Sequence, residues 1–86
     1  MFEIYGRNNC IWCERAKALL EVNGLPYIYL NIEEDKDALD IFKDYFPSAK
    51  TVPQILVEVD KFSWDVVGTF EDLRNYLKDG KQLELF

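Results

Sequence analysis

The residues best suited to chemistry are the two cysteines of the sequence, Cys10 and Cys13, in the motif Cys-Ile-Trp-Cys. Two thiols with this spacing at the start of a helix can face each other and close a small disulfide ring. Backbone N–H groups and the helix dipole there favour the thiolate of Cys10, and Arg7 adds a positive charge nearby. Burial opposes ionisation of Cys13. The pattern predicts redox chemistry, with Cys10 as the nucleophile and Cys13 as the resolving thiol.

Other uses of the two cysteines remain open. Both could be inert core residues, since free cysteine is often buried. A structural disulfide of a secreted protein is disfavoured, because we expect no signal peptide before the first predicted strand. A structural zinc site needs four ligands, whereas the chain has two cysteines and no histidine. Two chains sharing four thiolates could still form one.

Composition limits the function classes. The 86 residues are 49% hydrophobic and carry a formal net charge of −6. This length predicts one domain, residues 1–80, followed by a tail, residues 81–86. The excess of acidic over basic residues argues against a nucleic-acid partner. No apolar run approaches the length needed to span a membrane. We expect a cytoplasmic location, where a reactive thiol pair stays reduced.

A strand and a helix are predicted on either side of the cysteine motif. Residues 2–5 alternate as a half-buried strand does, and residues 6–9 predict a turn. From Trp12 onward apolar residues recur at helical spacing, until Gly24 and Pro26 indicate the end. The first cysteine is therefore expected at or just before the start of this helix.

Two further helices are predicted. One follows the acidic run 33–37 and ends at Pro47, and the other ends at Gly80. The apolar residues expected on their faces are Ala38, Leu39, Ile41, Phe42, Tyr45 and Phe46 in the former, and Phe70, Leu73, Tyr76 and Leu77 in the latter.

Three further strands complete the predicted fold, over residues 27–32, 54–59 and 62–67, with a hairpin turn at Asp60-Lys61. The order β-α-β-α-β-β-α predicts an α/β protein with a four-stranded mixed sheet and helices on both faces. The first two strands should run parallel, and the last two should form a hairpin on the other half of the sheet. The cysteine pair then lies beyond the C-terminal end of the first strand, where open α/β sheets place their sites.

Three separated motifs resemble glutaredoxins, which have the thioredoxin fold. Residues 6–17, Gly-Arg-Asn-Asn-Cys-Ile-Trp-Cys-Glu-Arg-Ala-Lys, resemble the active-site block. Residues 51–55, Thr-Val-Pro-Gln-Ile, resemble the loop with a cis-proline that faces the cysteines. Residues 67–73, Val-Gly-Thr-Phe-Glu-Asp-Leu, resemble the element that opens the last helix. The resemblance covers residues 1–78.

The resemblance implies a site for glutathione. If Pro53 is cis, the backbone of Val52 can pair with the cysteinyl part of glutathione like an added strand. Backbone N–H groups at the start of the last helix suit the γ-glutamyl carboxylate, and Asp72 could accept from the amine. Arg7 suits the glycyl carboxylate, with Lys50 and Lys17 as weaker candidates. The glutathione-binding residues implied are Arg7, Trp12, Thr51, Val52, Pro53, Gly68, Thr69, Glu71 and Asp72.

The sequence departs from the family pattern at two places. Ile11-Trp12 stands where the family commonly has Pro-Tyr, and Trp12 can still supply an aromatic wall. Thr69 replaces the second glycine of the last motif. Because a β-branched residue disfavours positive φ, we expect a different backbone or a less close approach there, and weaker glutathione binding.

The function implied is a glutathione-dependent thiol-disulfide oxidoreductase, with glutathione as reductant and no metal cofactor. It would act as a monomer on glutathione mixed disulfides and protein disulfides, ribonucleotide reductase being one candidate client. One alternative is a similar protein recharged by thioredoxin reductase. Another is a dimer that holds an iron–sulfur cluster through Cys10 and two glutathiones.

The tail suggests a further alternative, an interaction module. Residues 82–86, Gln-Leu-Glu-Leu-Phe, resemble the peptide with which bacterial replication proteins dock on the sliding clamp. The contact residues would be Gln82, Leu83, Leu85 and Phe86. The same residues could instead fold back onto the sheet.

Overall fold

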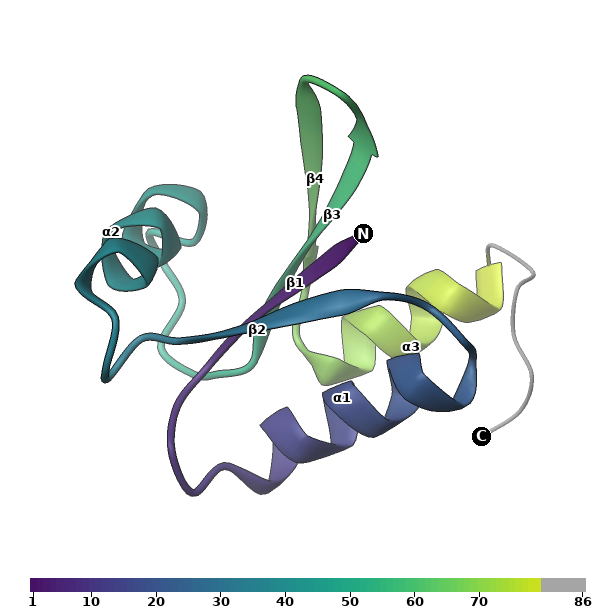
Figure 1. Cartoon of the computed structure of the whole chain (residues 1–86), viewed down its shortest axis with the longest axis horizontal. Helices are drawn as coiled ribbons and strands as arrows, with labels where there is room; N and C mark the ends of the chain where they lie inside the picture. The colour runs from purple at the N-terminus through teal and green to yellow at the C-terminus, as the bar shows by residue number, and fades with distance from the viewer. Residues whose placement is uncertain (80–86) are drawn as a thin grey trace.

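A four-stranded mixed sheet with strand order β2-β1-β3-β4 forms the centre of the protein (Figure 1). The structure is a computed structural model that describes residues 1–79, so Gly80 and the tail lie outside the described residues. The predicted order of elements is confirmed. The elements are β1 (Phe2–Gly6), α1 (Ile11–Val22), β2 (Tyr27–Asn31), α2 (Lys36–Tyr45), β3 (Gln54–Asp60), β4 (Ser63–Gly68) and α3 (Phe70–Asp79).

The directions of β1 and β3 bring two loops to the same end of the sheet. β1 runs parallel to β2, as predicted, and antiparallel to β3, and Tyr5 lies opposite Gln54. Since β1 ends where β3 begins, the cysteine loop after Gly6 emerges beside the loop that precedes Gln54. Proximity of the two predicted motifs therefore follows from the strand register.

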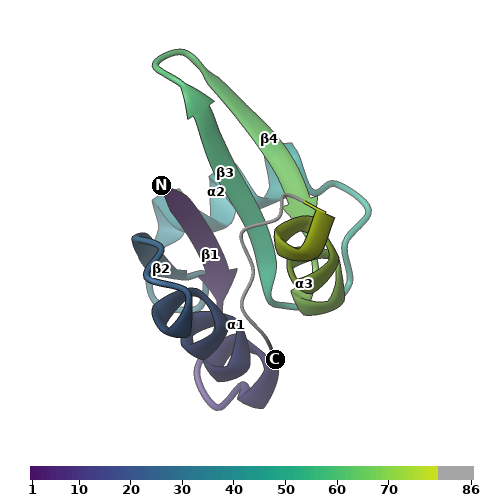
Figure 2. The ribbon, with the colours of Figure 1, turned by 90° about the vertical axis from the view of Figure 1, so that its right-hand side faces the viewer.

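Helices cover both faces of the sheet, as predicted. α1 and α3 lie side by side on one face and α2 lies on the other (Figures 1 and 2). The buried residues on the first face are Phe2, Ile4, Ala16, Leu19, Leu20, Ile55, Val57, Leu73 and Leu77. Those on the second face are Tyr5, Ala38, Phe42, Phe46 and Leu56.

The predicted apolar face of α2 is too wide. Ala38, Phe42 and Phe46 are buried, but Ile41 is 41% exposed and Tyr45 is 43% exposed. The three buried residues are spaced by four and lie along one side, with Leu39 partly buried beside them, so the buried stripe is narrower than the predicted face.

The predicted face of α3 is also too wide. Leu73 and Leu77 are buried, whereas Tyr76 is 42% exposed and packs at a right angle to the Phe2 ring, with centroids 6.2 Å apart. No helix within residues 1–79 has the length and apolar character needed to cross a membrane.

The β3–β4 hairpin turns one residue later than predicted. Asp60 still pairs in β3, and the turn is formed by Lys61 and Phe62. The Asp60 carboxylate accepts a hydrogen bond from the backbone N–H of Phe62 at 2.8 Å, which stabilises the turn at this position. Phe62 is consequently 90% exposed at the tip.

Candidate active site

Cys10 is the N-cap residue of α1, as the sequence predicted. Its backbone is extended (φ −125°, ψ 104°), and its sulfur accepts a hydrogen bond from the backbone N–H of Cys13 at 3.1 Å. The two cysteines form a disulfide, with Cα atoms 5.2 Å apart. Cys10 retains 8% exposure and Cys13 retains none. A reagent can therefore approach Cys10 more readily than Cys13.

Gly6 provides the space beneath this disulfide. A Cβ atom at this position would lie 2.8 Å from Cys13 Sγ and 2.7 Å from Cζ of Tyr29, too close for any larger residue without movement. The last residue of β1 is therefore glycine because a sulfur and an aromatic ring approach its backbone. The turn signal in the sequence located this glycine but did not reveal the packing.

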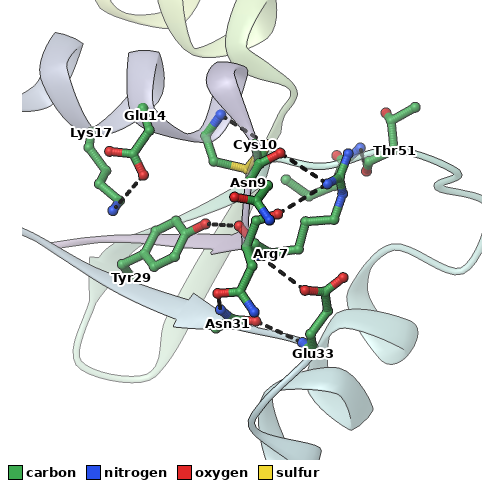
Figure 3. Close-up of a disulfide and its surroundings, with 12 residues drawn as sticks. Arg7, Asn9, Cys10, Glu14, Lys17, Tyr29, Asn31, Glu33 and Thr51 are labelled. Carbon is green, nitrogen blue, oxygen red and sulfur yellow. Dashed lines mark hydrogen bonds and ion pairs between the residues drawn. A yellow bond between two sulfur atoms is a disulfide. The ribbon is translucent and has the colours of Figure 1, made fainter.

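The loop between β1 and α1 places the Arg7 guanidinium at the rim of the site. Arg7 Nη1 donates to the carbonyl oxygens of Asn8 at 3.1 Å and Asn9 at 3.3 Å. Its side chain extends toward Thr51 (Figure 3). Asn9 adopts a positive φ of 52°, which asparagine tolerates better than most residues.

The loop before β3 has the cis Val52–Pro53 peptide bond that the resemblance implied. The buried side chain of Gln54 donates from Nε2 to the carbonyl oxygen of Thr51 at 3.1 Å. Gln54 thus supports this loop, a role that sequence reasoning missed. The signal was present, because a polar residue opens an otherwise apolar strand.

Thr69 caps α3 rather than adopting an unusual backbone. The positive φ falls on Gly68 (111°), so the predicted backbone conflict at Thr69 does not arise. The N–H and Oγ1 of Thr69 each donate to Oδ2 of Asp72 at 2.9 Å, and Oγ1 accepts from the Asp72 N–H at 3.4 Å. This reciprocal pair is a capping box.

A groove of about 710 Å³ joins these segments. Every glutathione-binding residue expected from the sequence lines it except Gly68 and Asp72. Lys50 lines it too, whereas Lys17 pairs with Glu14 at 3.1 Å. The lining residues are Arg7, Trp12, Ile32, Phe42, Ala49, Lys50, Thr51, Val52, Pro53, Thr69, Phe70 and Glu71.

Four of the lining residues, Ile32, Phe42, Ala49 and Phe70, were missed as site residues. Phe70 belongs to the motif at residues 67–73, which could have identified it. In the sequence Ile32, Phe42 and Ala49 carry only the apolar signal of a core residue, and their places in the groove depend on tertiary packing.

Aromatic and cationic side chains define the groove wall. The Trp12 ring packs against Phe70 with centroids 5.4 Å apart, and the Arg15 guanidinium lies 4.6 Å from the Trp12 ring centroid. Arg7 and Lys50 contribute positive charge to the groove. The carboxylate of Glu71, which also lines it, is paired with Arg74 (Oε2 to Nη1 3.6 Å). The groove thus combines an aromatic surface with sites for anions.

Residues 1–79 contain no group of three or more Cys, Asp or Glu side chains placed to hold a metal ion.

Comparison with known proteins assigns the family. The family described as Glutaredoxin matches residues 2–62. The chain belongs to the glutaredoxin family. The glutaredoxin of Enterobacteria phage T4 is 30% identical over 91 residues, covering 91% of this chain and all of the relative.

Solved structures confirm the thioredoxin fold. Reduced Escherichia coli glutaredoxin is 27% identical, with a TM-score of 0.71 over 95% of this chain and 98% of its own. A buckwheat glutaredoxin–glutathione complex is 19% identical, with a TM-score of 0.73 over 94% of this chain and 71% of its own. The glutaredoxin-like NrdH-redoxin of Escherichia coli, which has a thioredoxin-like activity profile, is 19% identical, with a TM-score of 0.63 over 88% and 92%. Family and fold together identify a thiol-disulfide oxidoreductase with a redox-active Cys-x-x-Cys pair.

Proposed function

We propose that this glutaredoxin-family protein reduces glutathione mixed disulfides and protein disulfides, with glutathione as the electron donor. The observation that carries the proposal is the groove that connects the cysteine loop, the cis-proline loop and the start of α3. Arg7 and Trp12, which lie on either side of Cys10 in the sequence, both line this groove. Neither cysteine lines the groove itself, but a tripeptide seated there would lie close to Cys10, the more accessible of the two.

Each part of glutathione has a chemical partner in this groove or, for the amine, in Asp72 beside it. Arg7 and Lys50 suit the glycyl carboxylate, and the backbone of Val52 suits the cysteinyl part. Backbone N–H groups at the start of α3, around Glu71, suit the γ-glutamyl carboxylate. Asp72 would accept from the amine, since a carboxylate can accept more bonds than the two that Thr69 donates.

The first chemical step is attack by the Cys10 thiolate on the glutathione sulfur of a mixed disulfide. A Cys10–glutathione disulfide forms as the client–glutathione bond breaks. The client sulfur leaves as a thiolate and takes a proton from water. A second glutathione thiolate then attacks the glutathione sulfur on Cys10, which releases oxidised glutathione and restores the Cys10 thiolate.

Protein disulfides need both cysteines. The Cys10 thiolate forms a mixed disulfide with one client sulfur, and the other client sulfur leaves as a thiol. Cys13 then attacks Cys10, which yields the Cys10–Cys13 disulfide found in this structure and the reduced client. Two glutathiones reduce the Cys10–Cys13 disulfide and are oxidised to one disulfide.

The deciding experiment is turnover of a small glutathione mixed disulfide, coupled to glutathione reductase and NADPH, with Cys10→Ser as the control. Activity that the substitution abolishes would support the proposal. No activity in this assay, together with activity when thioredoxin reductase is supplied, would show that the electron donor is thioredoxin reductase and not glutathione. Inactivity in both assays would favour an iron–sulfur dimer held by Cys10 and two glutathiones, which anaerobic purification would reveal by its brown colour, or an interaction module that docks through its tail.

Location and partners complete the proposal. We propose that the protein acts as a monomer in the cytoplasm, where glutathione keeps thiols reduced, with ribonucleotide reductase as a candidate client. The sliding clamp is a candidate partner for Gln82, Leu83, Leu85 and Phe86. Deleting residues 82–86 should then abolish clamp binding in a pull-down and leave redox turnover intact.

A further inference from the structure

Tyr29, on β2, holds the loop that carries Cys10. Its hydroxyl donates a hydrogen bond to the backbone carbonyl oxygen of Arg7 at 3.0 Å (Figure 3). Its ring approaches the backbone of Gly6, the residue that Cys13 Sγ also approaches. Tyr29 thus contacts the beginning of the loop next to the buried sulfur.

A second set of bonds fixes the middle of the same loop. Nδ2 of Asn31, at the end of β2, donates to Oδ1 of Asn8 at 2.9 Å. Asn8 donates from its backbone N–H to Glu33 at 3.2 Å and from Nδ2 to Glu34 at 3.0 Å. Oδ1 of Asn31 in turn accepts from the Glu33 N–H at 2.8 Å. We call these residues, Asn8, Tyr29, Asn31, Glu33 and Glu34, the loop clasp.

We propose that the loop clasp, chiefly through Tyr29, positions Cys10 as the cap of α1 and so sets how readily its thiol ionises and reacts. The thiolate is favoured by the backbone N–H of Cys13, 3.1 Å from the Cys10 sulfur. That distance holds only while the loop keeps Cys10 in its extended conformation. Tyr29 is a positioning residue and touches no substrate. The inference rests on the proposed function for its consequence in turnover.

The surroundings of Tyr29 keep its hydroxyl a donor over the range in which thiols ionise. Burial raises the pKa of Tyr29 above its ordinary value of 10.0. The charged groups that face it are Glu14 and Lys17 of α1, Arg7 of the loop and Glu33 after β2, and Lys17 Nζ lies 4.0 Å from the ring centroid. A pH profile between about 5 and 9 therefore reports the thiol and not the phenol.

The test measures the rate at which iodoacetamide alkylates Cys10 as a function of pH, in full-length Cys13→Ser protein, where Cys10 is the single thiol. Tyr29→Phe keeps the ring and removes the hydroxyl. The matched control is Tyr27→Phe, because Tyr27 lies two residues earlier on β2 and its hydroxyl bonds to Glu21, outside the site. We expect alkylation about two- to tenfold slower in Tyr29→Phe below the midpoint, with the midpoint shifted upward, and an unchanged profile in Tyr27→Phe.

Turnover of the mixed disulfide by the variants with Cys13 intact adds a second readout. A positioning role predicts a lower kcat with an unchanged KM in Tyr29→Phe. A Tyr29→Phe alkylation profile that superimposes on the parent, or an equal shift in Tyr27→Phe, would overturn the proposal. If circular dichroism shows that Tyr29→Phe does not fold, Asn31→Ala provides the same test. Alkylation needs no glutathione, so the two proposals can fail separately. If Tyr29→Phe shifts the alkylation profile but the unsubstituted protein does not turn over the mixed disulfide, the proposed function is refuted and the positioning role is retained.

Discussion

The backbone N–H of Cys13 donates to the sulfur of Cys10 at 3.1 Å, although Cys13 itself has no exposed surface. One cysteine thus stabilises the other through its backbone, and this contact does not depend on its own thiol. We predict that Cys13→Ser retains turnover of glutathione mixed disulfides and loses most reduction of protein disulfides. Two assays, with a glutathione mixed disulfide and with a protein disulfide, separate the activities.

Cys10→Ser is the control for this division of roles, and it should abolish both activities. Protein-disulfide turnover that persists in Cys13→Ser would show that Cys13 is not the resolving thiol.

Trp12 supplies the aromatic wall of the groove, 5.4 Å from the Phe70 ring. We predict that Trp12→Ala raises KM for a glutathione mixed disulfide about two- to tenfold with little change in kcat, because an aromatic contact is worth about 0.5–1.5 kcal/mol. Trp12→Tyr should restore most of the loss. Phe62→Ala, at the exposed hairpin tip, is the control. A normal KM in Trp12→Ala would remove Trp12 from the binding surface.

Thr69 caps α3 through its hydroxyl. Thr69→Val removes the acceptor for the Asp72 N–H and one donor to its carboxylate, so we predict a loss of about 1 kcal/mol in the free energy of unfolding. Urea unfolding measures this, with Thr69→Ser, which keeps the hydroxyl, as the matched control. Equal losses in the two variants would indicate that side-chain packing, and not capping, stabilises this position.

Ionisation of tyrosine side chains should lower the stability of the folded protein at high pH. The hydrogen bond to Glu21, followed by burial, raises the pKa of Tyr27 from 10.0 to about 12. Between these values the folded protein keeps a proton that the unfolded chain releases, so the free energy of unfolding falls as pH rises from about 10 to 12. Burial, followed by the bond to Glu3, shifts the pKa of Tyr5 in the same direction.

Urea unfolding across this pH range measures the effect. Tyr27→Phe should show a shallower decline than the parent, since it lacks one of the groups that titrate. An identical decline in both proteins would show that Tyr27 does not contribute.

Local sequence determined much of this protein. Alternation, strand-forming composition, turn signals and helical spacing predicted every element in its correct order, because each of them is a property of a short stretch of sequence. The Cys-x-x-Cys spacing and the helix start placed Cys10 at the N-cap, because capping depends on a few neighbouring residues. The cis-proline at Pro53 followed from resemblance.

Only the tertiary structure decided which apolar residues are covered and which line the groove. Ile41 and Tyr45 have helical spacing like that of Phe42, yet they are exposed because α2 packs on the sheet with the side that carries Ala38 and Phe42. The bond from Tyr29 to the Arg7 carbonyl joins residues 22 positions apart, and it exists because β2 pairs in parallel with β1. Contacts of this kind depend on strand register, which the periodicity of a single segment does not contain.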